Sequence, residues 1–492
     1  MTRAANLRMR VLGLVRRYEA RLTLIDPRRA ITSLIAVTAC GAIPLVSLWQ
    51  VAGAAARDID PVATAEPVPA QVTPLLSVRR VAESVHIESQ VSGARLGARR
   101  LQRELPKNSC LLIRSGGRDV ASYGATTPLI PGSNMKLLVA ATALEVLGAE
   151  YRYTTVVRGN VSGRVVVGNL WLVGGGDPHL VTRAAPVAPR YDVIAPTYLD
   201  TLVDELVAQG VTTVTGSVVG DGTRYDDERF APGWGDGIRG VEAGPLSGLI
   251  VDDGLPPGSL IRRPDPALAA AESLTALLRA RGITVVGNPR SSTVTDEVPI
   301  VASVVSAPLG QSIANVLTNS DNNSAELILK EIGVSARGEG TRIAGLQVVL
   351  DTVTRWDLPV AGIALADGSG LDRANLLTCD LLVSLLEHEA ANASFIDAMA
   401  IAGRTGTLSD VFRTPPARDS IRAKTGTLTA VKALSGRASR GGVDTSFALV
   451  VNDRRASAQS EWSAWWNRLA SALLTGGRAV SREALLPIET MG

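Results

Sequence analysis

Lysine is scarce in this chain, and two of the lysines lie in short motifs whose spacing suits acyl-transfer chemistry. Lysine and arginine together number 50 among the 492 residues, but the lysines are only Lys107, Lys136, Lys330, Lys424 and Lys432. Arginine keeps its proton near neutral pH, whereas a desolvated lysine can release it. A lysine retained among so many arginines is therefore a candidate for proton transfer or for binding an anion.

The first motif pairs Ser133 with Lys136 in the sequence SNMK, at the expected start of a helix that runs through Leu147. Residues i and i+3 of a helix share a face, so the Lys136 amine can approach the Ser133 hydroxyl. A serine needs such a base to attack a carbonyl, and a helix N-terminus favours the developing oxyanion. Alone the spacing is weak evidence, because an N-cap serine followed by an exposed lysine is the commoner arrangement.

Two further motifs lie downstream. SDN occupies residues 320–322, and KTGT occupies residues 424–427 on a segment expected to be a strand. Each is weak evidence by itself. In the order SxxK, SDN, KTG, however, the set is typical of serine acyl-transferases that act on penicillin-like and D-Ala-D-Ala substrates.

With these motifs the chain resembles the low-molecular-weight class C penicillin-binding proteins, the D-alanyl-D-alanine carboxypeptidases of peptidase family S13 (DacB-like). The resemblance spans about 105–455 and includes GGGDP at 174–178, DGSGL at 367–371 and GTL at 406–408. It implies a multi-domain α/β fold: a penicillin-binding/β-lactamase-like transpeptidase domain, with an antiparallel sheet flanked by helices, and a β-rich inserted domain. The stretch between the first two motifs looks short for the family, which predicts one inserted domain rather than two.

The resemblance also implies catalytic roles. Ser133 would be the acylated nucleophile and Lys136 the base that takes its proton. Ser320 would relay a proton toward the leaving D-alanine, and Asn322 would hold the substrate amide and orient Lys136. Water would then hydrolyse the acyl-enzyme, with no metal or organic cofactor.

Substrate binding is implied for the third motif. Lys424 and Thr425 would bind the terminal carboxylate, and Gly426 would leave room for the substrate along the strand. The backbone N–H groups of Ser133 and Thr427 would form the oxyanion hole. The implied partners are peptidoglycan stem peptides, with β-lactam antibiotics as covalent inhibitors, and DD-endopeptidase activity on cross-links remains open.

Two other motifs are expected to support the site rather than to act in it. The sequence RTGTL at 404–408 imitates KTGTL, but it begins with an arginine, so we interpret it as a structural turn. DGSG at 367–370 is interpreted as a glycine-rich turn beneath the site.

The N-terminal part predicts export. Residues 1–30 carry eight arginines against Glu19 and Asp26, and residues 31–56 are uncharged. At ~1.5 Å per residue such a segment crosses a ~30 Å hydrocarbon core, with its basic side in the cytoplasm. We expect an uncleaved anchor that places the main body on the extracytoplasmic face of the bacterial membrane. Cleavage after residues 54–56 and lipidation at Cys40 are the alternatives.

The remaining sequence predicts the domain organisation. A Pro-rich linker precedes the folded part, and helices and strands alternate on either side of a β-rich stretch. The expected units are a basic head at 1–30, an anchor at 31–56, a linker at 57–80, a discontinuous peptidase domain at 81–150 and 301–480, an insert at 151–300 and a tail at 481–492. Alternating residues around the turn at 115–117 predict a hairpin over 109–126. Long helices are expected at 313–332, 340–356 and 378–390. An amphipathic helix is expected at 460–474, and its tryptophans are expected to serve packing.

Composition limits the other functions. The formal net charge of +3 is a near balance that gives no support to nucleic-acid binding. Apart from Cys40, only Cys110 and Cys379 are available for a disulfide, and the sequence leaves their pairing open. A class A-like β-lactamase shares the three motifs but needs an ExxLN glutamate, which is missing from the sequence. A membrane-tethered wall-binding protein without catalysis is the second alternative.

Overall fold

The computed structural model describes most of the chain after residue 81, namely residues 82–185, 193–255, 261–440 and 443–474. The predicted head, anchor, linker and tail lie outside these residues. Among the helices that the structure describes, none is long and apolar enough to cross a bilayer.

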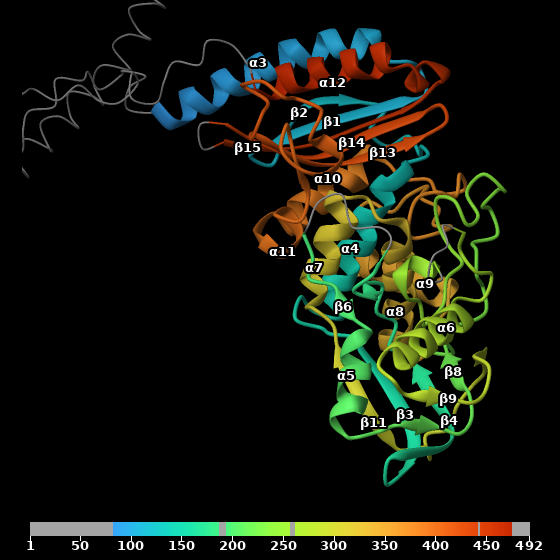
Figure 1. Cartoon of the computed structure of the whole chain (residues 1–492). Helices are drawn as coiled ribbons and strands as arrows, with labels where there is room; N and C mark the ends of the chain where they lie inside the picture. Colours follow the sequence, from blue (N-terminus) through green and yellow to red (C-terminus); the bar gives the residue numbers. More distant parts are fainter. Residues whose placement is uncertain (1–81, 186–192, 256–260, 441–442, 475–492) are drawn as a thin grey trace, which may run out of the picture. The chain divides into compact units, whose positions relative to one another are not determined.

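An antiparallel sheet of six strands carries the KTGT motif (Figure 1), in the order β12-β13-β14-β15-β1-β2. The strands are β1 (Ser109–Ser115), β2 (Arg118–Tyr123), β12 (Ala400–Ile401), β13 (Ile421–Leu428), β14 (Val431–Arg440) and β15 (Val443–Asn452). The hairpin predicted at 109–126 is confirmed as β1 and β2, with Gly116 and Gly117 at positive φ in its turn. Because β1 pairs with β15, segments from both ends of the described chain complete this sheet.

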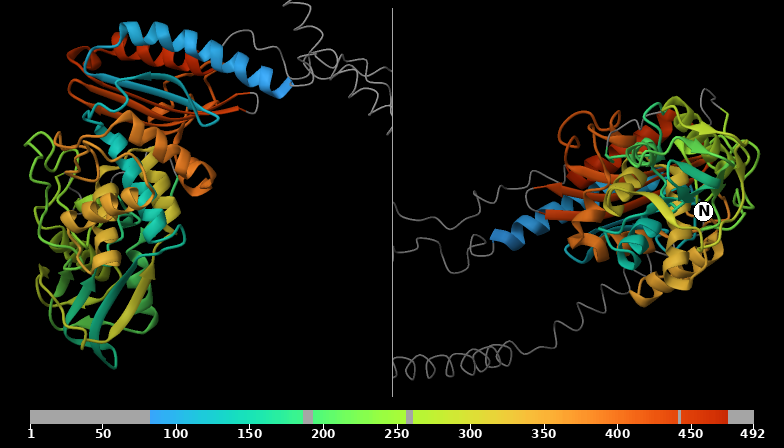
Figure 2. Two further views of the ribbon diagram at one scale, coloured as in Figure 1. Left: turned by 180° about the vertical axis from the view of Figure 1, so that it is seen from behind. Right: turned by 60° about the horizontal axis from the view of Figure 1, so that its bottom comes forward.

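Two helices lie side by side over one face of this sheet, α3 (Ala82–Glu104) and α12 (Gln459–Leu474) (Figures 1 and 2). Their apolar sides meet the strands, and Leu101, Trp465 and Trp466 are all buried there. Burial of the two tryptophans confirms that they serve packing. The six-stranded sheet flanked by helices is the predicted arrangement.

A helical layer covers the other face of the sheet. It contains α4 (Met135–Val146), α7 (Leu309–Thr318), α8 (Asn322–Arg337), α9 (Arg342–Arg355), α10 (Cys379–His388) and α11 (Ala393–Ile396). Every residue from Met135 to Leu144 is buried, so α4, which carries the SxxK motif, is the central helix of this layer.

The single helix predicted over 313–332 is wrong. The structure ends α7 at Thr318 and begins α8 at Asn322, and between them Ser320 adopts a left-handed φ of 65°. Asp321 then caps α8, because its carboxylate accepts a hydrogen bond from the Ser324 N–H at 2.7 Å. Residues 318–324 (TNSDNNS) are all polar, so the sequence did contain a signal for the break, which the prediction of one continuous helix did not take into account. The break lies at the SDN motif.

A second sheet lies within the β-rich stretch. Its strands are β3 (Thr154–Ser162), β4 (Val165–Val173), β7 (Thr213–Val214), β8 (Val218–Asp221), β9 (Thr284–Val285), β10 (Arg290–Ser291) and β11 (Ile300–Val305). The helices α5 (Asp200–Ala208) and α6 (Pro266–Ala280) pack on it, and β5 (Leu180–Val181) pairs with β6 (Thr197–Tyr198). All described residues fall in one unit of the chain, so the domain boundaries at 151 and 300 stay predictions.

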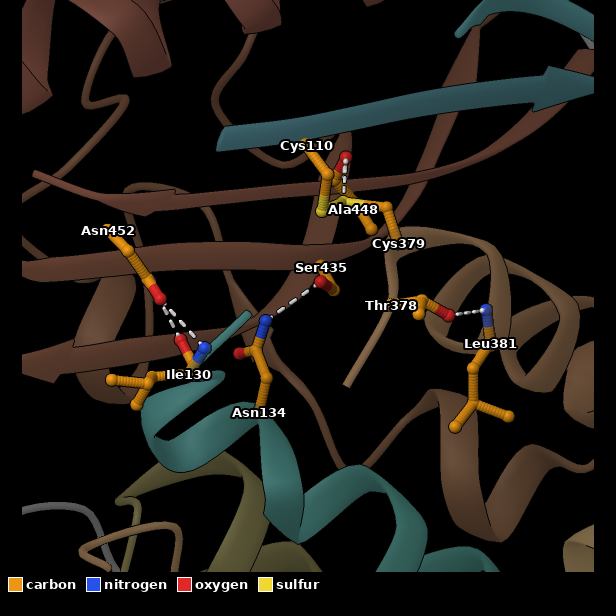
Figure 3. Close-up of a disulfide and its surroundings, with 9 residues drawn as sticks. All are labelled: Cys110, Ile130, Asn134, Thr378, Cys379, Leu381, Ser435, Ala448 and Asn452. Atoms are coloured by element: carbon orange, nitrogen blue, oxygen red, sulfur yellow. Dashed lines mark hydrogen bonds between the residues drawn. A yellow bond between two sulfur atoms is a disulfide. The ribbon is translucent and has the colours of Figure 1, made fainter. Parts of the chain in front are cut away.

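A disulfide joins the sheet to the helical layer (Figure 3). Cys110 lies in β1 and Cys379 is the first residue of α10, with Cα atoms 5.9 Å apart. The Thr378 hydroxyl caps the same helix by accepting a hydrogen bond from the Leu381 N–H at 3.0 Å. The pairing that the sequence left open is therefore present, and it ties the start of α10 to the central sheet.

Side-chain amides fix the SxxK turn against the sheet (Figure 3). Asn134 donates to the Ser435 hydroxyl on β14 at 2.8 Å. Asn452 on β15 accepts from the Ile130 N–H at 2.8 Å and donates to the Ile130 carbonyl at 3.0 Å. The segment before α4 therefore has a defined position relative to the strands.

Candidate active site

Ser133 and Lys136 face each other at the start of α4. Ser133 lies in a short 3-10 turn, Gly132–Asn134, and Lys136 is in the first turn of α4. The fully buried Lys136 Nζ lies 3.0 Å from the Ser133 Oγ. The i, i+3 approach predicted from the sequence is therefore present.

The Lys136 amine has two further partners, and both are neutral oxygens. Nζ donates to the Asn322 Oδ1 at 2.7 Å and to the Ser369 carbonyl at 2.6 Å. Burial lowers the pKa of Lys136 to about 8, although the nearby carboxylates of Asp367 and Glu326 oppose the shift. A neutral amine has two N–H groups for these acceptors, which leaves its lone pair for the Ser133 hydroxyl.

The glycine-rich turn at 367–370 supports this amine, as the sequence predicted. Glu326 on α8 accepts the N–H groups of Gly368 at 3.0 Å and Ser369 at 2.7 Å, and so holds the Ser369 carbonyl in place. Gly370 has a φ of 82°, and a Cβ there would lie 2.0 Å from the Gly132 carbonyl oxygen. Only glycine lets the two turns approach so closely.

The Asp367 carboxylate organises the same turn from within. It accepts from the Gly370 and Asp372 N–H groups, both at 2.7 Å, and from the Asn375 amide at 2.6 Å. The Trp234 indole, which comes from the β-rich stretch, donates to it at 2.7 Å. Buried carboxylates with several donors are satisfied by hydrogen bonds instead of a counter-charge.

The second motif connects the first to the third. The Ser320 hydroxyl accepts a hydrogen bond from the Lys424 Nζ at 2.8 Å, while Asn322 contacts Lys136 and donates to the Glu242 carbonyl at 3.0 Å. Lys424 also donates to the Thr425 carbonyl at 2.9 Å. Burial, together with repulsion from Lys136, holds the pKa of Lys424 well below its usual value.

The third motif runs beside the nucleophile. A Cβ added at Gly132 would lie 3.1 Å from the Thr427 nitrogen, and one added at Gly426 would lie 3.3 Å from the Ser133 nitrogen. The backbone amides of Ser133 and Thr427 are therefore neighbours. A side chain at Gly426 would also lie 2.4 Å from the Pro131 carbonyl oxygen, which explains the glycine.

Thr407 is a site residue that the sequence reasoning missed. Its hydroxyl oxygen lies 2.9 Å from that of Thr425, although 404–408 was interpreted only as a structural turn. Arg404 points elsewhere and pairs with Asp419 at 2.6 Å on the surface. The tetrapeptide TGTL occurs at both 405–408 and 425–428, and this repeat was the signal for Thr407. The arginine at position 404 instead favoured the interpretation as a structural turn.

A cavity of about 850 Å³ opens beside Thr427 of the third motif. One wall is the end of the β13–β14 hairpin, residues 427–430. Gly237, Ile238 and Glu242 from the β-rich stretch line it too, together with Leu371 and Arg373. The cavity is large enough for a peptide, and it reaches the site at Thr427 and Glu242.

The partly exposed Ser133 with its buried lysine partner, the SDN turn and the KTGT strand define a serine acyl-transferase of the penicillin-binding class. The model of the D-Ala-D-Ala carboxypeptidase 3 (S13) family matches residues 102–257 and 239–473. The chain therefore belongs to the D-Ala-D-Ala carboxypeptidase 3 (S13) family, whose members are serine hydrolases.

Individual proteins agree with this assignment. The D-alanyl-D-alanine carboxypeptidase of Actinomadura sp. (strain R39) is 28% identical over 421 residues, covering 68% of this chain and 76% of that protein. A Mycobacterium tuberculosis carboxypeptidase is 31% identical over 345 residues, covering 66% and 72%. The crystal structure of penicillin binding protein 4 (dacB) from Haemophilus influenzae shares the fold, with a TM-score of 0.64, 21% identity and coverage of 76% and 99%.

Proposed function

We propose that the chain removes the terminal D-alanine from peptidoglycan stem peptides through an acyl-enzyme on Ser133, and that penicillin acylates the same serine. The contact of Lys136 with Ser133 at 3.0 Å, in a setting that lowers the pKa of the amine to about 8, carries the proposal. Family membership supplies the substrate class. A crystal structure of the Haemophilus influenzae protein in complex with a β-lactam is consistent with it.

Acylation follows from the hydrogen bonds. The neutral Lys136 amine takes the Ser133 proton while Oγ attacks the carbonyl of the penultimate D-alanine. The amides of Ser133 and Thr427 donate to the oxyanion. The proton reaches the leaving nitrogen through Ser320, which breaks the peptide bond and releases D-alanine. Water then hydrolyses the ester and restores the serine.

Substrate binding uses the groups around the nucleophile. Asn322 holds the substrate amide, and Gly426 lets the peptide lie along β13. The terminal carboxylate binds to the threonine hydroxyls of β13, and Thr425 is oriented by Thr407. Lys424 also keeps Ser320 in place through the 2.8 Å hydrogen bond.

We further propose that residues 31–56 anchor this domain on the outer face of the bacterial membrane. The arginine-rich head and the uncharged segment support it. The Cys110–Cys379 disulfide also supports it, because disulfides persist in oxidising compartments. Protease treatment of intact spheroplasts should digest the body and leave an N-terminal fragment, whereas a body protected from protease contradicts the orientation.

The first experiment is intact mass of the purified protein after incubation with penicillin, beside assay of D-alanine release from a pentapeptide. Ser133→Ala is the matched variant. An adduct on the Ser133 peptide together with D-alanine release supports the carboxypeptidase. An adduct without release indicates a different acyl donor, and no adduct on the folded protein favours the wall-binding alternative.

A further inference from the structure

Lys432 lies beside the active-site strand but takes no part in the mechanism above. It is on β14, directly opposite Thr427 in the antiparallel register. Its Nζ donates to the Thr427 Oγ1 at 2.9 Å. The ammonium also lies 4.2 Å from the ring centre of Trp462 and 5.2 Å from that of Trp466, both on α12.

The alternation of side chains along β13 separates two sides of the strand. Lys424 and Gly426 point toward the Ser133 side, whereas Thr425 and Thr427 point toward the side of α12. Lys432 lies on the same side as the two threonines. A carboxylate that binds the threonine hydroxyls at the edge of the strand therefore comes close to Lys432.

Lys424 is poorly suited to supply charge to that carboxylate. It is fully buried, and two of its donor directions are already used for Ser320 and the Thr425 carbonyl. Its ammonium is disfavoured further by Lys136. The site therefore needs another cation if it is to select a charged terminus.

Lys432 meets this need. Its side chain is only partly buried, and Thr427 is exposed. Burial lowers the pKa of Lys432 as well, but no neighbouring cation in the described part of the chain adds to this shift as Lys136 does for Lys424. Among the residues that the structure describes, it makes no ion pair with a carboxylate, and it contacts one hydroxyl and two indole rings. Indole faces stabilise an ammonium without neutralising it. Because Thr427 accepts from Lys432, its own hydroxyl proton is free to point toward an incoming anion.

We propose that Lys432, with Thr427, is the cation that recognises the terminal carboxylate of the stem peptide and the carboxylate of a β-lactam. This assignment rests on the proposed carboxypeptidase function and deepens it. It makes Lys432 a specificity residue of the same site, while Lys424 serves mainly to hold Ser320.

The test compares charged and uncharged acyl donors. Second-order acylation by benzylpenicillin and by its methyl ester is measured for wild type, Lys432→Met, Lys432→Arg and the control Lys107→Met, which alters an exposed lysine outside the site. Lys432→Met should slow acylation by benzylpenicillin about tenfold or more, since a hydrogen bond to a charged group is lost. Acylation by the ester should change less than about threefold, and Lys432→Arg should restore most of the loss.

The outcomes are separable. Equal losses for acid and ester would show that Lys432 only positions Thr427 or the strand, and would overturn the proposal, as would an unchanged rate with benzylpenicillin. If Lys432→Met does not fold, the ratio of acid to ester rates for Lys432→Gln decides instead. Failure of the wild type to be acylated by either compound would refute the proposed function rather than this assignment.

Discussion

Helix α8 has two regions of buried polar side chains, and they are built differently. At its N-terminal end, Asn322 meets Lys136, whose hydrogen-bond partners are a hydroxyl, an amide oxygen and a carbonyl. In its middle, Lys330 forms an ion pair with Asp226, and Glu331 accepts from Arg224 at 2.8 Å. The first region contacts the nucleophile, and the second joins α8 to the loop after β8.

The difference shows that burial alone does not make a lysine a base. Lys136 and Lys330 have almost the same exposure, 0% and 1%. Lys330 has a carboxylate against its ammonium, so its charge is compensated. Among the described residues, Lys136 donates hydrogen bonds only to neutral oxygens. Burial therefore lowers its pKa, and the nearby carboxylates of Asp367 and Glu326 oppose this shift only in part. The chemical identity of the partner therefore separates Lys136, the proposed base, from Lys330 in its ion pair.

The largest effect is expected from Lys136→Arg. The variant keeps a cation but has no group that can take the Ser133 proton near neutral pH. Acylation by penicillin should slow by at least ~10³-fold, the scale of losing a catalytic base. Lys330→Arg is the matched control and should be acylated at close to the wild-type rate. A Lys136→Arg enzyme that acylates normally would remove Lys136 from the mechanism.

The pH dependence of acylation sharpens the same contrast. The base must be neutral, and the pKa of Lys136 is about 8. The acylation rate should therefore level off above about pH 9 and approach a tenfold fall per pH unit below about pH 7, which is about 50-fold between pH 8 and pH 6. Stopped-flow acylation of the wild type tests this. A profile that is flat between pH 6 and 8 would mean that Lys136 does not act as the neutral base.

Lys330→Met should chiefly affect stability. It leaves Asp226 without its partner, at an expected cost of about 2 kcal/mol, below the range for fully buried pairs because the Asp226 side chain is 32% exposed. Lys136→Met breaks no ion pair among the described residues and should therefore lower the free energy of unfolding less. Chemical denaturation of both variants measures the difference. Equal losses would show that the two lysines have equivalent surroundings.

The sequence predicted the parts of the site that depend on local pattern. Alternation and glycine placement identified the 109–126 hairpin, and the i, i+3 spacing identified the contact between Ser133 and Lys136. These features arise within one element, so a short window contains their cause. The order of the three motifs indicated the family, and the resemblance to that family implied further contacts between elements.

The missed features depend on contacts between distant segments. The helix break at Ser320 places its hydroxyl on Lys424, 104 residues away. The polar run at 318–324 signals a break but does not specify this distant partner. Thr407 reaches Thr425 only because η5 (Gly406–Leu408) lies beside β13. Glu326 lies in the sequence AELIL and accepts N–H groups 42 and 43 residues later.

The smallest effect is expected from Glu326→Gln, which is also the most specific test of the contrast between the two regions of α8. Glu326 is buried, and burial together with Asp367 raises its pKa to about 7. Because the pKa of Glu326 is higher in the folded protein than in the unfolded chain, its protonated form stabilises the fold. This stabilisation is fully present below pH 4.5 and is lost as the pH rises through about 7. Glutamine is neutral throughout, so the variant should lose this dependence and gain stability relative to wild type at pH 8.

The same substitution should barely change the chemistry. The glutamine oxygen can accept from Gly368 and Ser369 as the carboxylate does, so the Ser369 carbonyl stays on Lys136 and the maximal acylation rate should remain within about threefold. Because the Glu326 charge raises the pKa of Lys136, its removal should move the acylation profile to lower pH. Glu331→Gln, in the ion-paired region, should lower stability without moving the profile. A profile that moves equally in both variants would mean that the two regions of α8 are electrostatically alike.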